Sequence, residues 1–493
     1  MKNKYFISIL MLLSILVFSS CDEWLEEKPL TFLNSSNFYQ NDEEVTAAVY
    51  SLYQPLSDLY AQPQYAELNW ALWELPGDES YSNPGVGVVA QDQIDGYVFD
   101  TEIKNFEYWW KHSYVIINRS NTVIKNVENN ENISEEVKNT ALGEARFMRG
   151  VAYYELVVGW GDVPLMTEET TEMFPTRTAT EEVYKQVISD LQFAEENLPI
   201  SYDESEYGRA TKYAAKAYLA KVYLTMAGYP LQDASKMALA ASKAKEVIDG
   251  SPYMLYDDVL DNWNPDEQPK EQIFIVNRKR GLNWPAFASY WAPRMMTELA
   301  PEPGATFYGA FYPNEEFFNW FPDADPRKNK FFMLEATSFA DPSLTVTLPF
   351  PHVAKYWTPI YTDASDQDIV RLRFAEVLLI FAEAENEVNG PTELAYQAIN
   401  AVRARAFGDD SGNFSGLSKE QFRKSVRDER SIELCFEGIS WPDMLRTLET
   451  RTGSIYDYEN IGGVSPTDKN LLFPIPETEM LANRNLEPNP ANN

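Results

Sequence analysis

The chain has few of the residues on which most enzymes depend. Among its 493 residues there are two histidines, His112 and His352, and two cysteines, Cys21 and Cys435. The sequence contains no His-Glu-x-x-His motif, no Gly-x-Ser-x-Gly elbow, no P-loop and no dinucleotide-binding fingerprint. Histidine-based acid–base or triad catalysis therefore has no support. We predict that the protein is not an enzyme and binds no cofactor and no metal.

Two alternatives to this prediction depend on carboxylates, of which the chain has 75. Glycoside hydrolysis needs only two carboxyl groups at a set separation, so a glycoside hydrolase remains the less favoured alternative. Asp409, Asp410 and Asn413 form an acidic loop whose oxygens suit calcium, although their spacing fits no EF-hand. An ordinary solvated loop is the favoured interpretation there.

Basic residues are also scarce, since 41 Lys and Arg stand against 75 Asp and Glu for a net charge of −34. A nucleic-acid-binding protein needs a basic footprint, so nucleic acid is excluded as a partner. Beyond residue 21 there is no run of 18 apolar residues, and no transmembrane helix is expected there.

The first 20 residues have the layout of a secretory signal peptide. Lys2 and Lys4 precede an apolar run over 5–18 that is too short to span a bilayer. Two serines then lead directly into Cys21, an ending that resembles the lipobox of bacterial lipoproteins, although Phe18 stands where Leu is more usual. We predict a signal peptide over 1–20 and acylation of Cys21, which would anchor the protein to a membrane. An ordinary signal peptide with an incidental cysteine is the alternative.

Helical periodicity dominates the rest of the chain. It predicts helices over residues 46–60, 106–127, 134–159, 180–198, 211–227, 233–249, 370–388 and 393–407. Two of the helix pairs, each of roughly 34 residues with small side chains on one face, resemble tetratricopeptide repeats. The pairs are not contiguous, so they form a scaffold from which long segments depart.

We therefore predict a mainly α fold: a tetratricopeptide-like helix-pair scaffold with long loop-rich excursions and a few short strands. The boundaries are a single domain over 21–493, with the helical scaffold over about 40–250 and 369–450. The loop-rich segment over about 251–368 is called the excursion below, and a short strand is expected at 272–277.

The excursion is rich in aromatic side chains between residues 278 and 320. A loop this long within a compact domain is usually functional or disordered, and its aromatic content argues against disorder. Trp and Tyr offer a rigid apolar face, on which the C–H face of a sugar can stack, together with a polar handle. The candidate ligand-binding residues are Trp284, Tyr290, Trp291 and Tyr308, with Asn283 and Arg294 as polar partners and Tyr81 and Asn83 in second rank. For any single ring, core packing is an equally good interpretation.

Several helical segments carry charges of both signs. Because these residues lie on or beside helices, ion pairing within the scaffold is favoured over a ligand site. The residues are Arg146, Arg149, Arg427, Glu429, Arg430, Glu433, Glu437, Asp443 and Arg446.

Five segments together resemble one family, the SusD/RagB-like lipoproteins. They are residues 144–165 (EARFMRGVAYYELVVGWGDVPL), 209–224, 371–387, 426–446 (VRDERSIELCFEGISWPDMLR) and 472–490. Their order and spacing match the family over essentially the whole chain after the signal peptide. Pro442 departs from the family pattern, which has an aromatic residue before the aspartate, and Thr447 replaces a common tryptophan.

The resemblance implies an outer-membrane lipoprotein exposed on the cell surface. Such proteins capture a nutrient, most often an oligosaccharide, and deliver it to a TonB-dependent barrel of the SusC type. Their fold is a tetratricopeptide-like scaffold with a loop-rich binding face. A family member that captures peptides, or a tetratricopeptide-type peptide scaffold, is the alternative. Aromatic loops favour sugar, whereas a charged concave groove would favour peptide ends.

Overall fold

The computed structural model describes six stretches of the chain. They are residues 38–60, 69–168, 173–279, 287–361, 365–460 and 462–489. The predicted signal peptide and the predicted acylation site at Cys21 lie outside these stretches. In chain order, the α-helices and β-strands are α2 (Asp42–Tyr50), α3 (Tyr53–Asp58), α4 (Ala71–Glu74), β1 (Ser80–Ser82), α5 (Val89–Asp95), α6 (Lys104–Val127), α7 (Glu135–Trp160), α8 (Thr180–Asn197), α9 (Lys212–Ala227), α10 (Lys236–Gly250), β2 (Gln272–Val276), α11 (Phe287–Trp291), β3 (Phe311–Pro313), α12 (Glu315–Trp320), α13 (Arg327–Phe331), β4 (Phe332–Thr337), β5 (Thr345–Val353), β6 (Ile369–Arg373), α14 (Phe374–Asn389), α15 (Glu393–Phe407), α16 (Lys419–Glu433), α17 (Ser440–Thr447) and α18 (Glu477–Ala482).

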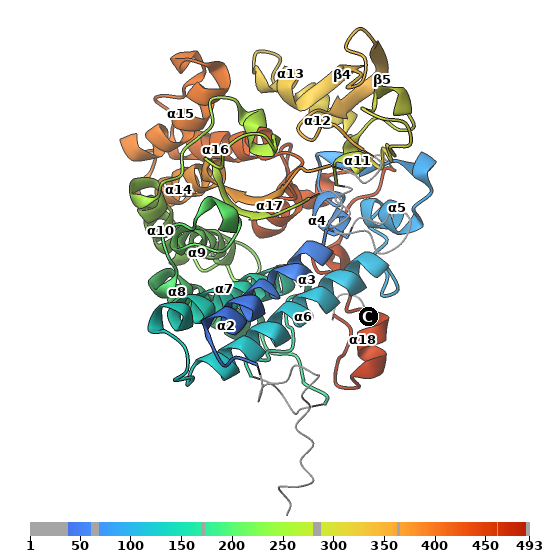
Figure 1. The fold of residues 1–493 in the computed structure, drawn as a ribbon. Coiled ribbons are helices and arrows are strands. Elements are labelled where there is room, and N and C mark those ends of the chain that lie inside the picture. The colour runs from blue at the N-terminus through green and yellow to red at the C-terminus, as the bar shows by residue number, and fades with distance from the viewer. Residues whose placement is uncertain are drawn as a thin grey trace, which may run out of the picture.

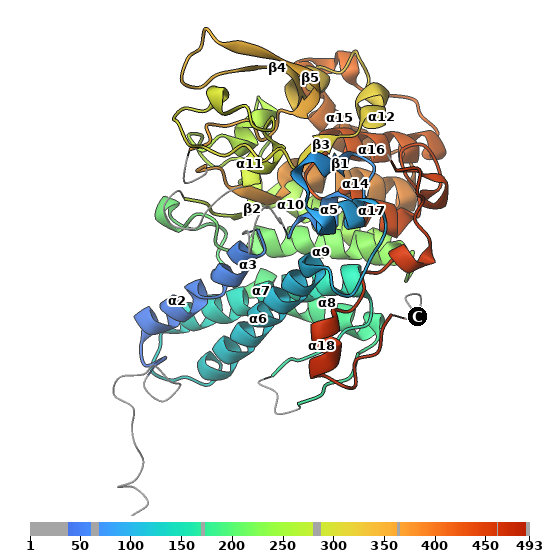
Figure 2. The ribbon, with the colours of Figure 1, turned by 90° about the vertical axis from the view of Figure 1, so that its right-hand side faces the viewer.

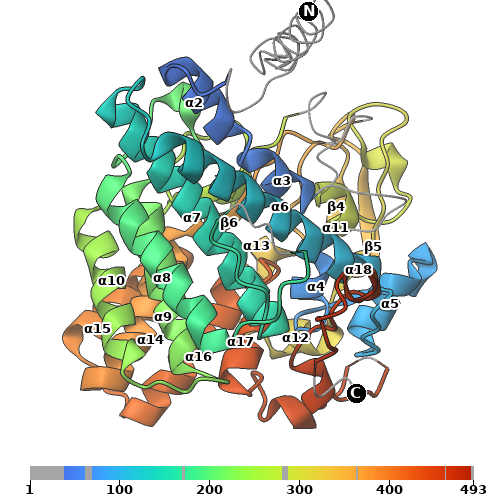
Figure 3. The ribbon, with the colours of Figure 1, turned by 90° about the horizontal axis from the view of Figure 1, so that it is seen from below.

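The scaffold helices pack as successive neighbours, from α6 through α7, α8, α9, α10 and α14 to α15. Figure 3 shows α6 to α10 lying side by side, with α14 and α15 beyond them. Neighbouring helices α9 and α10 both carry fully buried small side chains, namely Ala214, Ala217, Ala240 and Ala244. Their size lets the two helix backbones approach closely. The predicted mainly α, tetratricopeptide-like scaffold is therefore confirmed.

Helix α7 sits between α6 and α8 and forms the centre of this half of the scaffold. The side chain of Ser134 accepts a hydrogen bond from the Val137 backbone N–H and begins the helix as predicted. A Cβ atom on Gly143 would lie 2.9 Å from Cδ2 of Leu198, just after the end of α8. Glycine at this position therefore allows α8 to pack directly on the α7 backbone.

Two predicted helices are divided or shortened in the structure. The segment 46–60 forms two helices, because α2 ends at Tyr50 and α3 begins at Tyr53. The segment 370–388 begins as strand β6, which pairs antiparallel with β2 before α14 starts at Phe374. An apolar run such as this suits a strand or a buried helix equally, so the distant partner strand decides its structure. The strand predicted at 272–277 is confirmed as β2.

The excursion lies at one end of the scaffold. In Figure 1, α11, α12, α13, β4 and β5 gather at the top, with α4 and α5 of the N-terminal half beside them. Its aromatic side chains continue the main hydrophobic core, to which Phe287, Trp291 and Phe317 belong. In the part of the excursion that the structure describes, the loop-rich face is thus built on packed side chains.

Buried ion pairs also hold the excursion to the scaffold. Arg327 of α13 is fully buried and donates hydrogen bonds to Glu429 at 2.6 Å and to Glu433 at 2.8 Å, both in α16. Lys355 donates to Glu437 at 2.8 Å, and Arg373 donates to Glu433 at 2.6 Å. We call this cluster the ion clamp; it comprises Arg327, Lys355, Arg373, Arg405, Glu429, Glu433 and Glu437.

The charged residues singled out in the sequence all pair within the scaffold. Beyond the ion clamp, Arg149 forms a two-pronged contact with Asp190, and Arg146 lies 3.8 Å from Glu128. The prediction of structural ion pairing is confirmed. None of the described helices has an apolar stretch long enough to cross a membrane.

Candidate functional site

A short pair of strands joins the early loop to the excursion. Strands β1 and β3 are antiparallel, and Tyr81 is the register partner of Tyr312. Their rings meet edge to face with centroids 5.9 Å apart. Asn83 Nδ2 donates to the Gly309 carbonyl at 2.7 Å and to Tyr312 Oη at 3.1 Å, although Asn83 and Tyr312 are 229 residues apart in the sequence. Figure 2 shows β1, β3 and α5 together at this face.

Strand β5 extends this cluster with two more rings. Phe350 and His352 are two residues apart and therefore point to the same face of the strand. Their rings are stacked with centroids 4.8 Å apart, and Tyr312 meets them edge to face at 4.8 and 4.9 Å. Phe350 is 38% exposed and Tyr81 is half-buried, whereas Tyr312 and His352 are buried. We call Tyr81, Tyr312, Phe350 and His352 the aromatic row.

Tyr308 and Arg294 lie near one end of this row. Tyr308 is half-buried, and its ring stacks on Tyr290 with centroids 5.3 Å apart. Arg294 Nη1 donates to the Tyr308 carbonyl at 3.2 Å. A Cβ atom on Gly309, whose φ is +54°, would lie 2.6 Å from Cβ of Arg294. Glycine here lets the Arg294 segment pack against the stretch before β3 that carries Tyr308 and receives the Asn83 hydrogen bond.

The prediction of ligand contact is wrong for Tyr290 and Trp291, which are 0% and 1% exposed. Both lie on the short helix α11, whose side chains all face the core. The Trp291 ring packs between Phe311, Tyr356 and Phe436. No face of either ring is open to a sugar, so both rings act as core. Asn283 and Trp284 lie outside the described residues.

The structure therefore brings together Tyr81, Asn83, Tyr308 and Arg294, two of which were in second rank. It adds Tyr312, Phe350 and His352, which the sequence reasoning missed. The sequence could have indicated Phe350 and His352, because apolar residues alternate along 346–353 in a way that is typical of a half-buried strand. Nothing in the sequence indicates that this strand lies beside β3.

Two carboxylates support the backbone of this face. Ser82 Oγ donates to Asp92 Oδ1 at 2.6 Å, and the Ser82 backbone N–H donates to Asp95 Oδ2 at 3.2 Å. Burial raises the pKa of Asp95 to about 7, and the negative charge of Asp92 acts in the same direction. Helix α5 is thus fixed to β1 by hydrogen bonds next to Tyr81.

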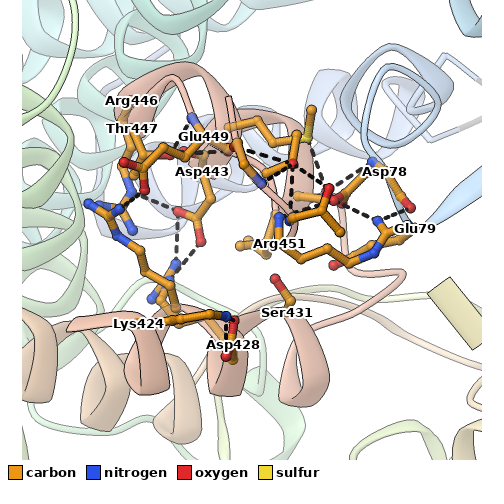
Figure 4. A pocket seen from close by; sticks show the side chains of 18 of the residues that line it. Asp78, Glu79, Lys424, Asp428, Ser431, Asp443, Arg446, Thr447, Glu449 and Arg451 are labelled. Carbon is orange, nitrogen blue, oxygen red and sulfur yellow. Dashed lines mark hydrogen bonds and ion pairs between the residues drawn. The ribbon is translucent and has the colours of Figure 1, made fainter. Parts of the chain in front are cut away.

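A second feature is a charged pocket of about 410 Å³ between α16, α17, residues 78–79 and residues 449–453. Figure 4 shows charged side chains of both signs around it. Arg430 Nε donates to Asp443 Oδ2 at 2.7 Å, and Arg451 lies 2.6 Å from Asp78. Burial raises the pKa of Asp443, but the positive charges of Arg430 and Arg446 outweigh it and hold this pKa well below its usual range. A ligand here would compete with existing ion pairs.

Metal ligation has no support within the described stretches, where no group of three or more His, Cys, Asp or Glu side chains could hold an ion. In the acidic loop considered for calcium, Asp409 accepts from the Ser411 backbone N–H at 2.8 Å. Asp410 accepts from Asn413 Nδ2 at 2.8 Å. These side chains cap the local turns.

The fold and this face define a class: a tetratricopeptide-like scaffold that carries a loop-rich face with partly exposed aromatic side chains. Two family models match the chain, the SusD family over residues 337–491 and "Starch-binding associating with outer membrane" over residues 23–224. These matches confirm the resemblance to the SusD family that the sequence motifs predicted.

Known relatives agree with this assignment. The chain is 29% identical to the SusD-like protein P25 of Formosa agariphila, over 87% of this chain and 88% of that protein. A crystal structure of a SusD superfamily protein from Parabacteroides distasonis superimposes with a TM-score of 0.82 at 27% identity, covering 93% of this chain and 100% of that one. A laminarin-binding SusD-like protein shares the fold, with a TM-score of 0.75 at 20% identity over 92% of this chain and all of that one.

Proposed function

We propose that this protein is a cell-surface lipoprotein of the outer membrane that binds an oligosaccharide or polysaccharide. It passes this ligand to a TonB-dependent barrel of the SusC type for import. Acylated Cys21 holds the single domain over 21–493 to the membrane. Support comes from the family, from the matched model described as starch-binding and outer-membrane-associated, and from the laminarin-binding neighbour of the same fold.

The aromatic row is the observation that carries the proposal. The rings of Tyr81 and Phe350 are accessible at its two ends, and the buried rings of Tyr312 and His352 fix their positions. Each ring stands on a strand, so little conformational entropy is lost when a sugar stacks on it. Asn83 and Arg294 supply polar groups beside the rings, although each already donates a hydrogen bond to a backbone carbonyl of the protein.

Binding without turnover is part of the proposal. Glycoside hydrolysis needs two carboxyl groups on opposite sides of the bond that breaks. Near the aromatic row, Asp92 and Asp95 both contact the Ser82 hydroxyl, at 2.6 and 3.5 Å. Both bond to one residue of β1, so this pair lies on one side of a sugar bound to the row and favours a binding protein over a hydrolase.

A peptide ligand is the second candidate, and the charged pocket is the observation that favours it. Its volume of about 410 Å³ suits one or two residues of a peptide, and its walls carry both signs of charge. A peptide end would have to displace partners such as Lys424 and Asp428, which are 2.8 Å apart. This competition makes the pocket the weaker candidate.

A calorimetric panel on the full-length chain in detergent micelles tests the proposal. We expect heat of binding with at least one glycan and none with mixed short peptides. Binding of peptides alone would overturn the glycan assignment. Copurification of the barrel with the wild-type chain, and loss of membrane attachment in Cys21→Ser, would test the partner and the anchor separately.

A further inference from the structure

The charges beside the aromatic row are mostly of one sign. Asp92 and Asp95 contact Ser82, the residue next to Tyr81. Glu315 is exposed and begins α12, three residues after Tyr312. Burial raises the pKa of the Tyr81 hydroxyl, and the negative charges of Asp95 and Glu315 raise it further. Both carboxylates therefore act electrostatically on the ring at this end of the row.

Arg294 also acts electrostatically on the row. Its positive charge lowers the pKa of Tyr312, against the larger effect of burial. Several cations of the excursion are paired with carboxylates elsewhere. Lys328 is 2.6 Å from Asp323, Lys330 is 2.7 Å from Asp258, and Lys355 belongs to the ion clamp. Asp92 and Glu315 thus outnumber Arg294 beside the row, and Asp95, whose pKa burial raises to about 7, adds a third negative charge as the pH rises above that value.

This imbalance distinguishes uncharged from anionic glycans. A neutral sugar stacks on an aromatic ring through apolar contact, which is insensitive to salt. A carboxylate or sulfate group on the sugar would approach Glu315 and Asp95 within a Debye length and would be repelled. The net charge of −34 on the whole chain adds a long-range repulsion that lowers the association rate.

We propose that the aromatic row selects uncharged glycans and rejects glycans that carry carboxylate or sulfate groups. This inference rests on the proposed glycan-binding function and specifies its substrate class. The carboxylates next to Tyr81 and after Tyr312 are the residues that impose the selection.

Calorimetry on the full-length chain in detergent micelles tests the inference with pairs of polysaccharides. Each pair has one backbone in a neutral form and in a carboxylated or sulfated form. At about 0.01 M salt we expect the anionic form to bind about five- to tenfold more weakly, and at about 1 M salt we expect the difference to disappear. The affinity for the neutral form should not change with salt.

A charge-reversing variant identifies the residues responsible. Glu315→Lys should raise the affinity for the anionic form about two- to fivefold at low salt and leave the neutral form unchanged. Glu393→Lys is the matched control, because Glu393 is also an exposed first residue of a helix, α15, and we expect no effect.

The outcomes separate this inference from the function on which it rests. Equal or tighter binding of the anionic form at low salt would overturn the selection while leaving glycan binding intact. An effect of Glu393→Lys equal to that of Glu315→Lys would refute the assignment to the local charges. Absence of binding for both forms of every pair would overturn the proposed function and this inference with it.

Discussion

Replacing Arg327 with methionine should destabilise the protein more than any surface charge change, because Arg327 is fully buried within the ion clamp. Its guanidinium donates to Asp325 at 2.7 and 3.0 Å, to Glu429 at 2.6 Å and to Glu433 at 2.8 Å. Methionine fills much of the same volume but leaves these carboxylates without one of their partners.

The size of the effect follows from which partners remain. Glu429 keeps Arg403 at 2.6 Å, and Glu433 keeps Arg373 at 2.6 Å, whereas Asp325 loses its charged partner. Removing one member of a buried ion pair costs about 3–5 kcal/mol of stability. Because Arg403 and Arg373 still pair with Glu429 and Glu433, we expect a cost near the lower end of this range. For a chain of this length, about 1 kcal/mol corresponds to roughly 1 °C in Tm, so we expect a fall of about 3–4 °C.

Urea unfolding and thermal melts of the full-length chain measure this loss. Lys328→Met is the matched control, because the adjacent Lys328 pairs with Asp323, whose side chain is 94% exposed. The Lys328 side chain is 12% exposed and also donates to the Phe321 carbonyl at 3.0 Å, but its ion pair with so exposed a carboxylate is worth at most about 1 kcal/mol. Combining Arg327→Met with Asp325→Asn should restore part of the stability. If Arg327→Met proved no less stable than Lys328→Met, the ion clamp would not be what holds the excursion in place.

Three further predictions concern the rings, the strand junction and pH. Trp291→Ala should lower the free energy of unfolding in urea by about 3–5 kcal/mol and leave the glycan affinity of the folded protein almost unchanged. If the free energy of glycan binding fell by as much as the free energy of unfolding, Trp291 would belong to the ligand site after all. Asn83→Ala should lower the free energy of unfolding by about 1–2 kcal/mol and also weaken glycan binding, because it removes the hydrogen bonds to Gly309 and Tyr312. Asn132→Ala, in an exposed turn, is its control. Burial raises the pKa of Glu74 to about 8, so its contribution to stability is complete below pH 4.5 and is lost as the pH rises to about 8. Urea midpoints measured over this pH range should fall with rising pH in the wild-type protein and fall less in Glu74→Gln. The same pH profile in both proteins would contradict the assignment of this loss to Glu74.

The scaffold could be predicted from the sequence because its signals are local. Residues within one helix share a face at a spacing of three or four, and the small side chains that allow close packing, such as Ala214 and Ala217, are visible directly. The charged motifs were also interpretable, since a buried helix with charges of both signs has few alternatives to ion pairing.

The candidate site was harder because its geometry depends on distant partners. Tyr81 and Tyr312 become neighbours only when β1 pairs with β3, and no local pattern indicates that pairing. The burial of Tyr290 and Trp291 was equally hidden. A five-residue helix rich in aromatic residues has no polar face from which its solvent-exposed side could be predicted. Its orientation is decided by packing against Phe311 and Phe436. Composition pointed to the segment that supplies Tyr308 and Tyr312, but it could not show that Tyr290 and Trp291 are buried.

The central claim is that exposed rings of the aromatic row hold a glycan. Titration of Tyr81→Ala/Phe350→Ala with whichever neutral polysaccharide binds the wild-type chain tests it most directly. Tyr456→Ala serves as control, because Tyr456 is 39% exposed, close to the 38% of Phe350, and lies elsewhere. We predict at least about a fivefold loss of affinity in the double variant and none in the control, since each of the two stacking contacts contributes about 0.5–1.5 kcal/mol. Wild-type affinity in a folded double variant would contradict the account.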